Sequence, residues 1–307
     1  MTSLGSVPSV LLGVLLMVVA GGSSLRADAV VRVAATTSLV ADLVREIGGT
    51  RVSVKSLMGP GVDPHSYQPT PSDLRALQDA DVVAFHGLHL EGRMENVLQR
   101  LRSRRAQVVA ITSDLPVTRL RRVGEGEGAY DPHVWFEVGL WRECISTVVA
   151  ALVRADPAGT ETYQARGEAL RARLVALDEW VRRELAVIPK ERRVLVTSHD
   201  AFGYFGRAYD FEVIGLQGIS TVGEAALSAM TELTQLLARR RIPAIFVESS
   251  VSPKAIQRVA VDAGVRVGGE LYSDSLGAPG LAADGTDPST YEGMVRHNVR
   301  TLVSALR

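Results

Sequence analysis

The sequence predicts an α/β protein of two lobes, each a mainly parallel four-stranded sheet flanked by helices, with one long rigid helix between them. Short apolar runs alternate with amphipathic stretches, this alternation occurs in both halves, and a long amphipathic stretch without an internal proline separates the halves. With 307 residues the chain is long enough for two domains of about 150 residues each. The predicted divisions are a signal peptide at 1–29, an N-terminal lobe at 30–155, a linking helix at 156–188 and a C-terminal lobe at 189–307.

The N-terminal segment is typical of an export signal. An apolar run at 10–20 (VLLGVLLMVVA) precedes Ala27-Asp28-Ala29, and this order predicts a cleaved signal peptide and a periplasmic protein. The run is too short for a membrane span of about 20 residues. No Lys or Arg precedes the run, so only the amino terminus supplies the usual positive charge. The single cysteine, Cys144, excludes an intrachain disulfide and a C-x-x-C motif, and we expect no lipid anchor because the cleavage site has no cysteine.

The predicted elements follow in order along each half. Strands at 30–35, 52–58, 81–85 and 107–111 alternate with helices at 39–47, 72–78 and 94–102. In the second half, strands at 193–197, 212–216, 244–248 and 265–271 alternate with helices around Gly203 and at 225–239 and 253–263. Strands that alternate with helices in this way predict parallel sheets.

Two further helices are predicted outside this alternation. The stretch 157–186 carries apolar residues at steps of three, four and seven, which predicts a continuous helix of roughly 40 Å that acts as a strut. Pro157 and Pro189 mark its two ends. The stretch 291–306 predicts a terminal helix with one apolar side.

Four polar residues stand out by their spacing. His65, His133, His199 and Asp274 are separated by 68, 66 and 75 residues, and each follows a short apolar run of strand type. Ligands of open parallel sheets bind outside the carboxyl ends of the strands. Three imidazoles and one carboxylate suit a single transition-metal ion, so the sequence predicts a metal site between the two lobes.

The local contexts of these residues support the prediction to different degrees. His65 lies in a turn-rich loop, where a histidine is more often a surface residue, although Asp63 can orient its imidazole. His133 follows Asp131-Pro132, which alone would indicate a helix start, but Trp135 beside it favours a dry pocket.

The sequence context supports His199 as a ligand more strongly than it supports Asp274. His199 ends a predicted strand, whereas Asp274 alone is more often a capping or turn residue. Glu248 also ends a strand and can face the same cleft.

Three other histidines carry a weaker signal. His86 and His89 follow a strand, but their spacing also suits a lobe interface or a pocket wall, and the sequence leaves their roles open. His297, in the terminal helix, is interpreted as structural.

The motifs around these positions resemble the metal-binding solute receptors of bacterial ABC importers for zinc and manganese, the cluster A-I or TroA-like family. The resemblance covers nearly all of the chain after the signal segment. Its motifs are GVDPHSY at 61–67, GLHLE at 87–91, DPHVW at 131–135, SHDAFGYF at 198–205, GIST at 218–221, YEGM at 291–294 and HN at 297–298.

The resemblance implies a rigid two-lobed receptor whose four ligand positions match His65, His133, His199 and Asp274. It also implies delivery of the ion to a membrane permease that a cytoplasmic ATPase drives. Two features depart from the family pattern. The stretch 119–128 lacks the histidine-rich loop of many zinc receptors, and a lipid-anchor cysteine is missing.

We therefore expect an extracytoplasmic solute-binding protein, not an enzyme, that captures one Zn²⁺ or Mn²⁺ as a monomer. Zinc accepts this ligand set in a tetrahedral site, and manganese becomes possible if Asp274 binds through both oxygens. The balance of 34 basic and 34 acidic residues gives no indication of a nucleic-acid partner. Two alternatives remain: a secreted zinc-dependent hydrolase, although an H-E-x-x-H motif is missing, and a metal-binding, adhesin-like surface module of the cell adhesion family.

Overall fold

The first half of the chain forms one parallel sheet. The computed structural model describes residues 1–2, 30–102, 107–125, 130–280 and 285–307, so nearly all of the predicted signal peptide lies outside the described residues. The strands β1 (Val31–Ala35), β2 (Val52–Ser56), β3 (Val82–Phe85) and β4 (Val108–Ala110) are arranged in the order β2-β1-β3-β4. All neighbours in this sheet are parallel, as the sequence predicts.

Helices connect these strands. They are α1 (Ser38–Gly48), α2 (Pro71–Asp79) and α3 (Glu95–Arg102). The side chain of Thr37 caps α1, and Thr70 with Asp73 forms a capping box at α2. These caps fix where each helix begins after its strand.

Two helices follow His133, and the sequence predicted the bounds of neither. They are α4 (Val138–Trp141) and α5 (Cys144–Ala155). The sequence of α5, CISTVVAALVRA, is apolar and rich in β-branched residues, and neither helix has a capping side chain. Such a run does not distinguish a buried helix from a strand by its pattern alone.

The second half repeats the strand-helix alternation with a different sheet. The parallel pair β5 (Val194–His199) and β6 (Glu212–Gln217) and the parallel pair β7 (Ala244–Glu248) and β8 (Arg266–Leu271) are separate ladders rather than one four-stranded ladder. The two pairs touch through β5 and β7. At their carboxyl ends, the amide of His199 donates to the Glu248 side chain instead of to a backbone carbonyl. At this point a hydrogen bond to a side chain, and not a backbone ladder bond, connects β5 with β7.

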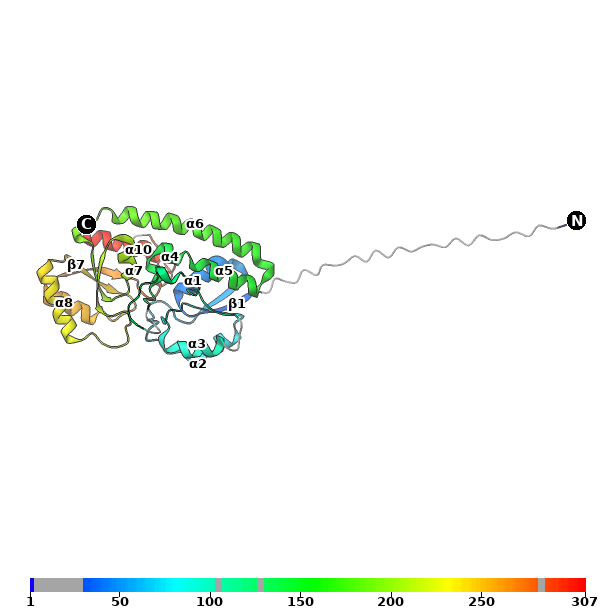
Figure 1. The fold of residues 1–307 in the computed structure, drawn as a ribbon, viewed down its shortest axis with the longest axis horizontal. Helices are drawn as coiled ribbons and strands as arrows, with labels where there is room; N and C mark the ends of the chain where they lie inside the picture. Colours follow the sequence, from blue (N-terminus) through cyan, green and yellow to red (C-terminus); the bar gives the residue numbers. More distant parts are fainter. Residues whose placement is uncertain (3–29, 103–106, 126–129, 281–284) are drawn as a thin grey trace.

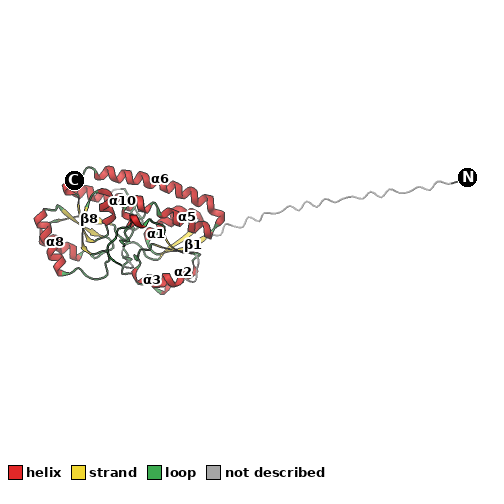
Figure 2. Cartoon of the chain, viewed as in Figure 1, coloured by secondary structure: helices red, strands yellow, loops and turns green. Residues whose placement is uncertain are grey.

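Three further helices cover these strands. They are α7 (Gly203–Tyr209), α8 (Leu227–Arg240) and α9 (Lys254–Ala263). Figure 2 shows helices around the strands of both halves. The α/β class with parallel sheets flanked by helices is confirmed.

The long helix α6 (Thr160–Leu185) joins the two halves without a break. It has 26 residues, or about 39 Å at 1.5 Å per residue, and follows a 3₁₀ turn at Pro157–Gly159. In Figure 1 it runs along one edge of the molecule over both groups of strands. It packs against α1 and α5 from the first half and against α10 (Tyr291–Leu306) from the end of the chain.

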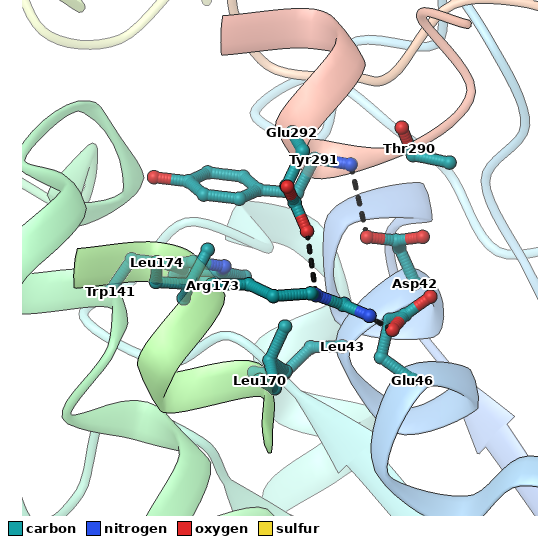
Figure 3. A pocket seen from close by; sticks show the side chains of 10 residues that line it. All are labelled: Asp42, Leu43, Glu46, Trp141, Leu170, Arg173, Leu174, Thr290, Tyr291 and Glu292. Atoms are coloured by element: carbon teal, nitrogen blue, oxygen red, sulfur yellow. Dashed lines mark hydrogen bonds and ion pairs between the residues drawn. The ribbon is translucent and has the colours of Figure 1, made fainter. Parts of the chain in front are cut away.

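Arg173 fastens α6 to two other helices (Figure 3). Its Nε lies 2.9 Å from Oε1 of Glu292 at the start of α10, and its Nη2 pairs with Glu46 of α1. Beside this group, the backbone N–H of Tyr291 donates to Oδ2 of Asp42 at 3.0 Å. Burial raises the pKa of Asp42 to about 7, because the charged carboxylate is poorly solvated there. The three helices are thus held together at one point.

The hydrophobic core is continuous between the halves. One cluster of buried side chains contains Val33 of β1, Leu177 of α6, Phe246 of β7 and Leu302 of α10. The described part of the chain contains no helix that is both long and apolar enough to cross a membrane.

Candidate metal centre

The four predicted ligand residues meet at one buried point. His65, His133, His199 and Asp274 each offer one ligand atom, and these four atoms all lie within 4.8 Å of one another. Nε2 of His65 lies 3.2 Å from Nε2 of His133. Oδ1 of Asp274 lies 3.4 Å from Nε2 of His133, and its Oδ2 lies 3.4 Å from Nε2 of His199. The nitrogen and oxygen donors therefore face a common centre.

The four residues reach this centre from different kinds of segment. His199 is the last residue of β5, and Asp274 comes three residues after β8 ends at Leu271. His65 lies in a loop well beyond β2. The interpretation of His133 as a residue that follows a strand is wrong, because it stands before the 3₁₀ helix Val134–Phe136 and after an isolated antiparallel bridge at Tyr130.

Asp131 orients His133. Its Oδ1 accepts a hydrogen bond from the His133 backbone N–H at 3.0 Å and lies 2.7 Å from Nδ1 of the same residue. Burial lowers the pKa of His133, but the carboxylates of Asp131 and Asp274 outweigh burial and hold it above its ordinary value. With Nδ1 held by Asp131, Nε2 is left to face the centre.

Glu248 has the same relation to His199. Its Oε1 accepts from the His199 backbone N–H at 2.9 Å, and its Oε2 lies 2.6 Å from Nδ1 of His199. Burial again lowers the pKa of the histidine, yet Asp274 and Glu248 together raise it well above its ordinary value. The strand-ending Glu248 therefore faces the centre as an orienting carboxylate behind a histidine.

Asp63 holds His65 through the backbone. Asp63 accepts from the His65 N–H at 2.9 Å, from the Ser66 hydroxyl at 2.7 Å and from the Thr221 hydroxyl at 2.6 Å. Burial, with the two nearby histidines, lowers the pKa of His65 to about 4. This imidazole is therefore neutral at physiological pH.

Asp274 completes the centre with both of its oxygens. Burial raises the pKa of its carboxyl group, but His199 and His133 outweigh burial and hold it well below its ordinary value. The hydroxyl of Ser250 donates to Oδ2 at 3.2 Å. Nothing in the sequence indicated the contribution of Ser250, because the serine lies 24 residues away and belongs to no motif that we identified.

Two donor atoms at the centre have no hydrogen-bond partner. Nε2 of His199 and Oδ1 of Asp274 are buried, and neither makes a hydrogen bond within the described residues. Buried polar groups are nearly always hydrogen-bonded, so an unpaired nitrogen and oxygen at the same point are atoms that a cation could satisfy. Imidazole nitrogen with carboxylate oxygen is a donor set for transition metals.

Hydrogen bonds between the two halves hold the ligand loops together. The indole N–H of Trp135 donates to the carbonyl of Ser273 at 2.9 Å, and the hydroxyl of Tyr291 donates to the carbonyl of Trp135 at 2.7 Å. The backbone N–H of Gly61 donates to the Ser275 hydroxyl at 2.9 Å. The segments that carry His133, His65 and Asp274 are therefore mutually fixed.

The other three histidines lie apart from the four ligand candidates. His86 is buried with its Nε2 2.7 Å from the carbonyl of Pro132, and burial lowers its pKa to about 3. It thus contacts the segment just before His133. His89 pairs with Glu95 at the surface at 2.6 Å, and Nε2 of His297 lies 3.0 Å from the carbonyl of Glu270.

Comparisons with known proteins place these features in a family. The family model described as ZnuA, the periplasmic component A of a zinc-uptake complex, matches residues 33–305. The chain is 45% identical over 286 residues to the manganese-binding lipoprotein MntA of Bacillus subtilis, covering 92% of this chain and 91% of that one. It is 45% identical over 291 residues to the zinc-binding protein TroA of Treponema pallidum, covering 93% and 92%. A solved structure of the periplasmic zinc-binding protein TroA from Treponema pallidum matches with a TM-score of 0.84 at 44% identity, over 90% of this chain and 98% of that one.

Proposed function

This chain belongs to the ZnuA family of periplasmic zinc-uptake components, and from that premise we propose that it captures a divalent transition-metal ion outside the cytoplasm and delivers it to an ABC importer. The family consists of solute-binding proteins and not of enzymes. The metal is the cargo, and His65, His133, His199 and Asp274 bind it. The secreted hydrolase and the adhesin-like module are not favoured, because two relatives that are each 45% identical to this chain are named as metal-binding proteins.

One observation carries this proposal. Nε2 of His199 and Oδ1 of Asp274 are buried without hydrogen-bond partners, and they lie among four ligand atoms within 4.8 Å of one another. A divalent ion at this point satisfies both atoms and offsets the cost of burying the Asp274 carboxylate. Asp131 and Glu248 hold the two histidine rings so that the cargo meets a preformed ligand set.

The cargo is Zn²⁺ or Mn²⁺. The two relatives that are each 45% identical have names for different metals, manganese and zinc. Four protein ligands suit tetrahedral zinc, and both oxygens of Asp274 face the centre, which gives manganese the additional oxygen that it prefers. Zinc binds more tightly in solution by the Irving–Williams order whichever ion is imported.

The remaining features of the proposal concern location and partners. We propose that residues 1–29 are a cleaved signal peptide, that the mature protein is a periplasmic monomer without a lipid anchor, and that the permease subunit of the importer is its partner. The lobes are 30–155 and 189–307, joined by 156–188. The relative MntA is by contrast named a lipoprotein, and mass spectrometry of the mature chain decides this point.

Metal titration tests the proposed site. Calorimetry of the mature chain with Zn²⁺ or Mn²⁺ should give one ion per chain. His199→Ala and Asp274→Ala should each weaken binding by at least about a hundredfold, because they remove a ligand at the centre. His297→Ala is the matched control, because the His297 ring contacts the Glu270 carbonyl and the Tyr272 ring and is not one of the four ligand candidates, and it should leave the affinity within about twofold. Equal losses in the three variants, or two equally tight sites, would contradict the proposal.

A further inference from the structure

The two carboxylate oxygens of Asp274 have different surroundings. Oδ1 is buried and has no hydrogen-bond partner within the described residues, whereas Oδ2 accepts a hydrogen bond from the hydroxyl of Ser250 at 3.2 Å. Each oxygen is equally close to a ligand nitrogen, since Oδ1 lies 3.4 Å from Nε2 of His133 and Oδ2 lies 3.4 Å from Nε2 of His199. The bond from Ser250 is therefore what distinguishes the two oxygens.

The direction of this hydrogen bond follows from the neighbouring groups. The Ser250 hydroxyl also lies 2.8 Å from the hydroxyl of Ser273. A serine hydroxyl has one proton to donate, and an ionised carboxylate can only accept. Ser250 makes both bonds only when it donates to Asp274 and accepts from the fully buried Ser273. The bond from Ser273 polarises the Ser250 hydroxyl and strengthens its bond to Asp274.

The backbone holds Ser250 beside Asp274. Ser250 comes two residues after β7 ends, and Asp274 comes three residues after β8 ends. Beyond the paired strands, the backbone N–H of Ser249 donates to the carbonyl of Leu271 at 3.0 Å. The donor and the carboxylate are thus fixed to the ends of two neighbouring strands. Outer groups that are held in this way orient and tune the ligands of a metal.

A hydrogen bond to one oxygen changes how a carboxylate binds a cation. A carboxylate binds a metal through one oxygen or through both. The bond from Ser250 draws electron density from Oδ2 and leaves Oδ1 as the stronger donor of the two. Tetrahedral zinc with three histidines needs one oxygen, whereas manganese prefers more oxygen ligands and a higher coordination number. The bond therefore favours the ion that needs one oxygen from Asp274.

We propose that Ser250 is a specificity-determining residue, whose hydroxyl biases Asp274 towards binding through Oδ1 alone and so favours Zn²⁺ over Mn²⁺. This inference rests on the proposed function, because it takes a divalent cargo at the four ligand residues. Ser250 is a positioning residue and not a ligand, since it acts through Asp274. A chain without this hydroxyl keeps the ligand set and discriminates less between the two ions.

Ser250→Ala tests the proposal through the ratio of two dissociation constants, that for Mn²⁺ divided by that for Zn²⁺. The ratio should fall by about fivefold or more, because Oδ2 becomes free to bind and manganese gains more from it than zinc. Zinc affinity is measured by competition with a chelating indicator, and manganese affinity by electron paramagnetic resonance of the free ion. Simple damage to the site would weaken both ions equally and leave the ratio unchanged.

Two further variants isolate the hydroxyl. Ser249→Ala is the matched control, because Ser249 is the neighbouring serine and its buried hydroxyl makes no hydrogen bond within the described residues. It should leave the ratio within about twofold of the wild-type value. Ser250→Thr keeps the hydroxyl and should also retain the wild-type ratio. Ser250 is half-buried and borders a cavity of about 630 Å³, so the added methyl group has room.

Infrared difference spectra of zinc-loaded against metal-free protein give a readout that does not depend on affinity. The two stretching bands of a carboxylate are widely separated when one oxygen binds the metal and closer together when both bind. The separation in the zinc-loaded protein should decrease in Ser250→Ala and stay at the wild-type value in Ser249→Ala and Ser250→Thr. Thermal unfolding of the metal-free variants confirms that each is folded.

Three results would overturn the role of Ser250. They are an unchanged ratio in Ser250→Ala, an equal change in Ser249→Ala, and a change in Ser250→Thr as large as that in Ser250→Ala. Each leaves the proposed function intact, since the wild-type chain still binds its ion. A wild-type chain that binds neither ion would instead overturn the proposed function and this inference together.

Discussion

The three histidines of the metal centre differ in how firmly they hold a proton. Carboxylates raise the pKa of His133 and raise that of His199 well above its ordinary value, whereas burial lowers the pKa of His65 to about 4. Protons therefore compete with an incoming cation more strongly at His133 and His199 than at His65. Proximity of a carboxylate, more than burial, decides which imidazole competes with the metal.

Zinc affinity should accordingly fall as the pH decreases from 7.5 to 5. The raised pKa values of His133 and His199 strengthen the competition of protons with the metal at these two residues, while the pKa of His65 is lowered to about 4. Calorimetry in buffers of different ionisation enthalpy should show that zinc binding releases more protons per ion as the pH decreases. A site dominated by carboxylates would hold its ion until about pH 4 to 5, so a flat affinity between pH 7.5 and 5 would refute the histidine site.

The raised pKa of Asp42 leads to a second prediction, which concerns the pH dependence of stability. Its folded pKa of about 7 lies above the ordinary value of an aspartate, so the folded state holds the proton more tightly and stability decreases as the pH rises from about 4 to 7. Asp42→Asn keeps an acceptor for the Tyr291 N–H and removes the buried charge. Urea unfolding should show a gain of about 1 to 2 kcal/mol at pH 8 and a smaller gain at pH 5. The exposed Asp79→Asn should change neither value, and a loss of stability at pH 8 in Asp42→Asn would contradict the argument.

The loop after β3 lies against the backbone of His65. Gly87, Leu88 and His89 have φ of 93°, 53° and 63°, a left-handed run that costs roughly 1 kcal/mol or more at each non-glycine residue. The buried carboxylate of Glu91 offsets this cost by accepting from the backbone N–H groups of His86 and Gly87. The loop then brings Gly92 against the carbonyl of His65.

Gly92→Ala should therefore impair the metal centre. A Cβ at Gly92 would lie 2.6 Å from the His65 carbonyl oxygen, at a φ of 35° that side chains rarely adopt. We expect a loss of about 1 to 3 kcal/mol in unfolding free energy and a decrease of about tenfold in zinc affinity, measured by thermal unfolding and calorimetry. Gly59→Ala is the control, because a Cβ at Gly59 meets nothing within 4 Å. Similar behaviour of the two variants would mean that the contact at Gly92 does not position His65.

The sequence predicted most strands and helices because their apolar residues recur with a clear period. The boundaries of α6 and α10 come from continuous amphipathic patterns, and the spacing of four polar residues selected the groups that meet at the centre. Three features had no local signal. They were the helix α5, whose apolar run is ambiguous, the division of the second sheet at β5 and β7, and the position of His133 after an isolated bridge. Each depends on contacts between residues distant in the sequence, which periodicity does not record.

The molecule as a whole should change little in shape on metal binding. The continuous helix α6 and the shared hydrophobic core leave few residues between the halves to absorb the dihedral changes of a hinge. Small-angle scattering of metal-free and metal-loaded protein should give profiles that nearly superimpose. A decrease in radius of gyration on loading, of the size that hinged receptors show, would contradict this expectation.

The same shared core also determines when the chain can finish folding. The hydroxyl of Ser38 accepts from the N–H of Leu276, and Asp42 accepts from that of Tyr291, so α1 is joined to segments 238 and 249 residues later. Contacts of such sequence separation form slowly, because the intervening chain must first be brought together. The contacts of α1 with the C-terminal segments can therefore form only when α10 (Tyr291–Leu306), next to the end of the chain, has been synthesised. The core that the two halves share is therefore completed only at the end of synthesis, and until then the newly made chain lacks part of its native packing.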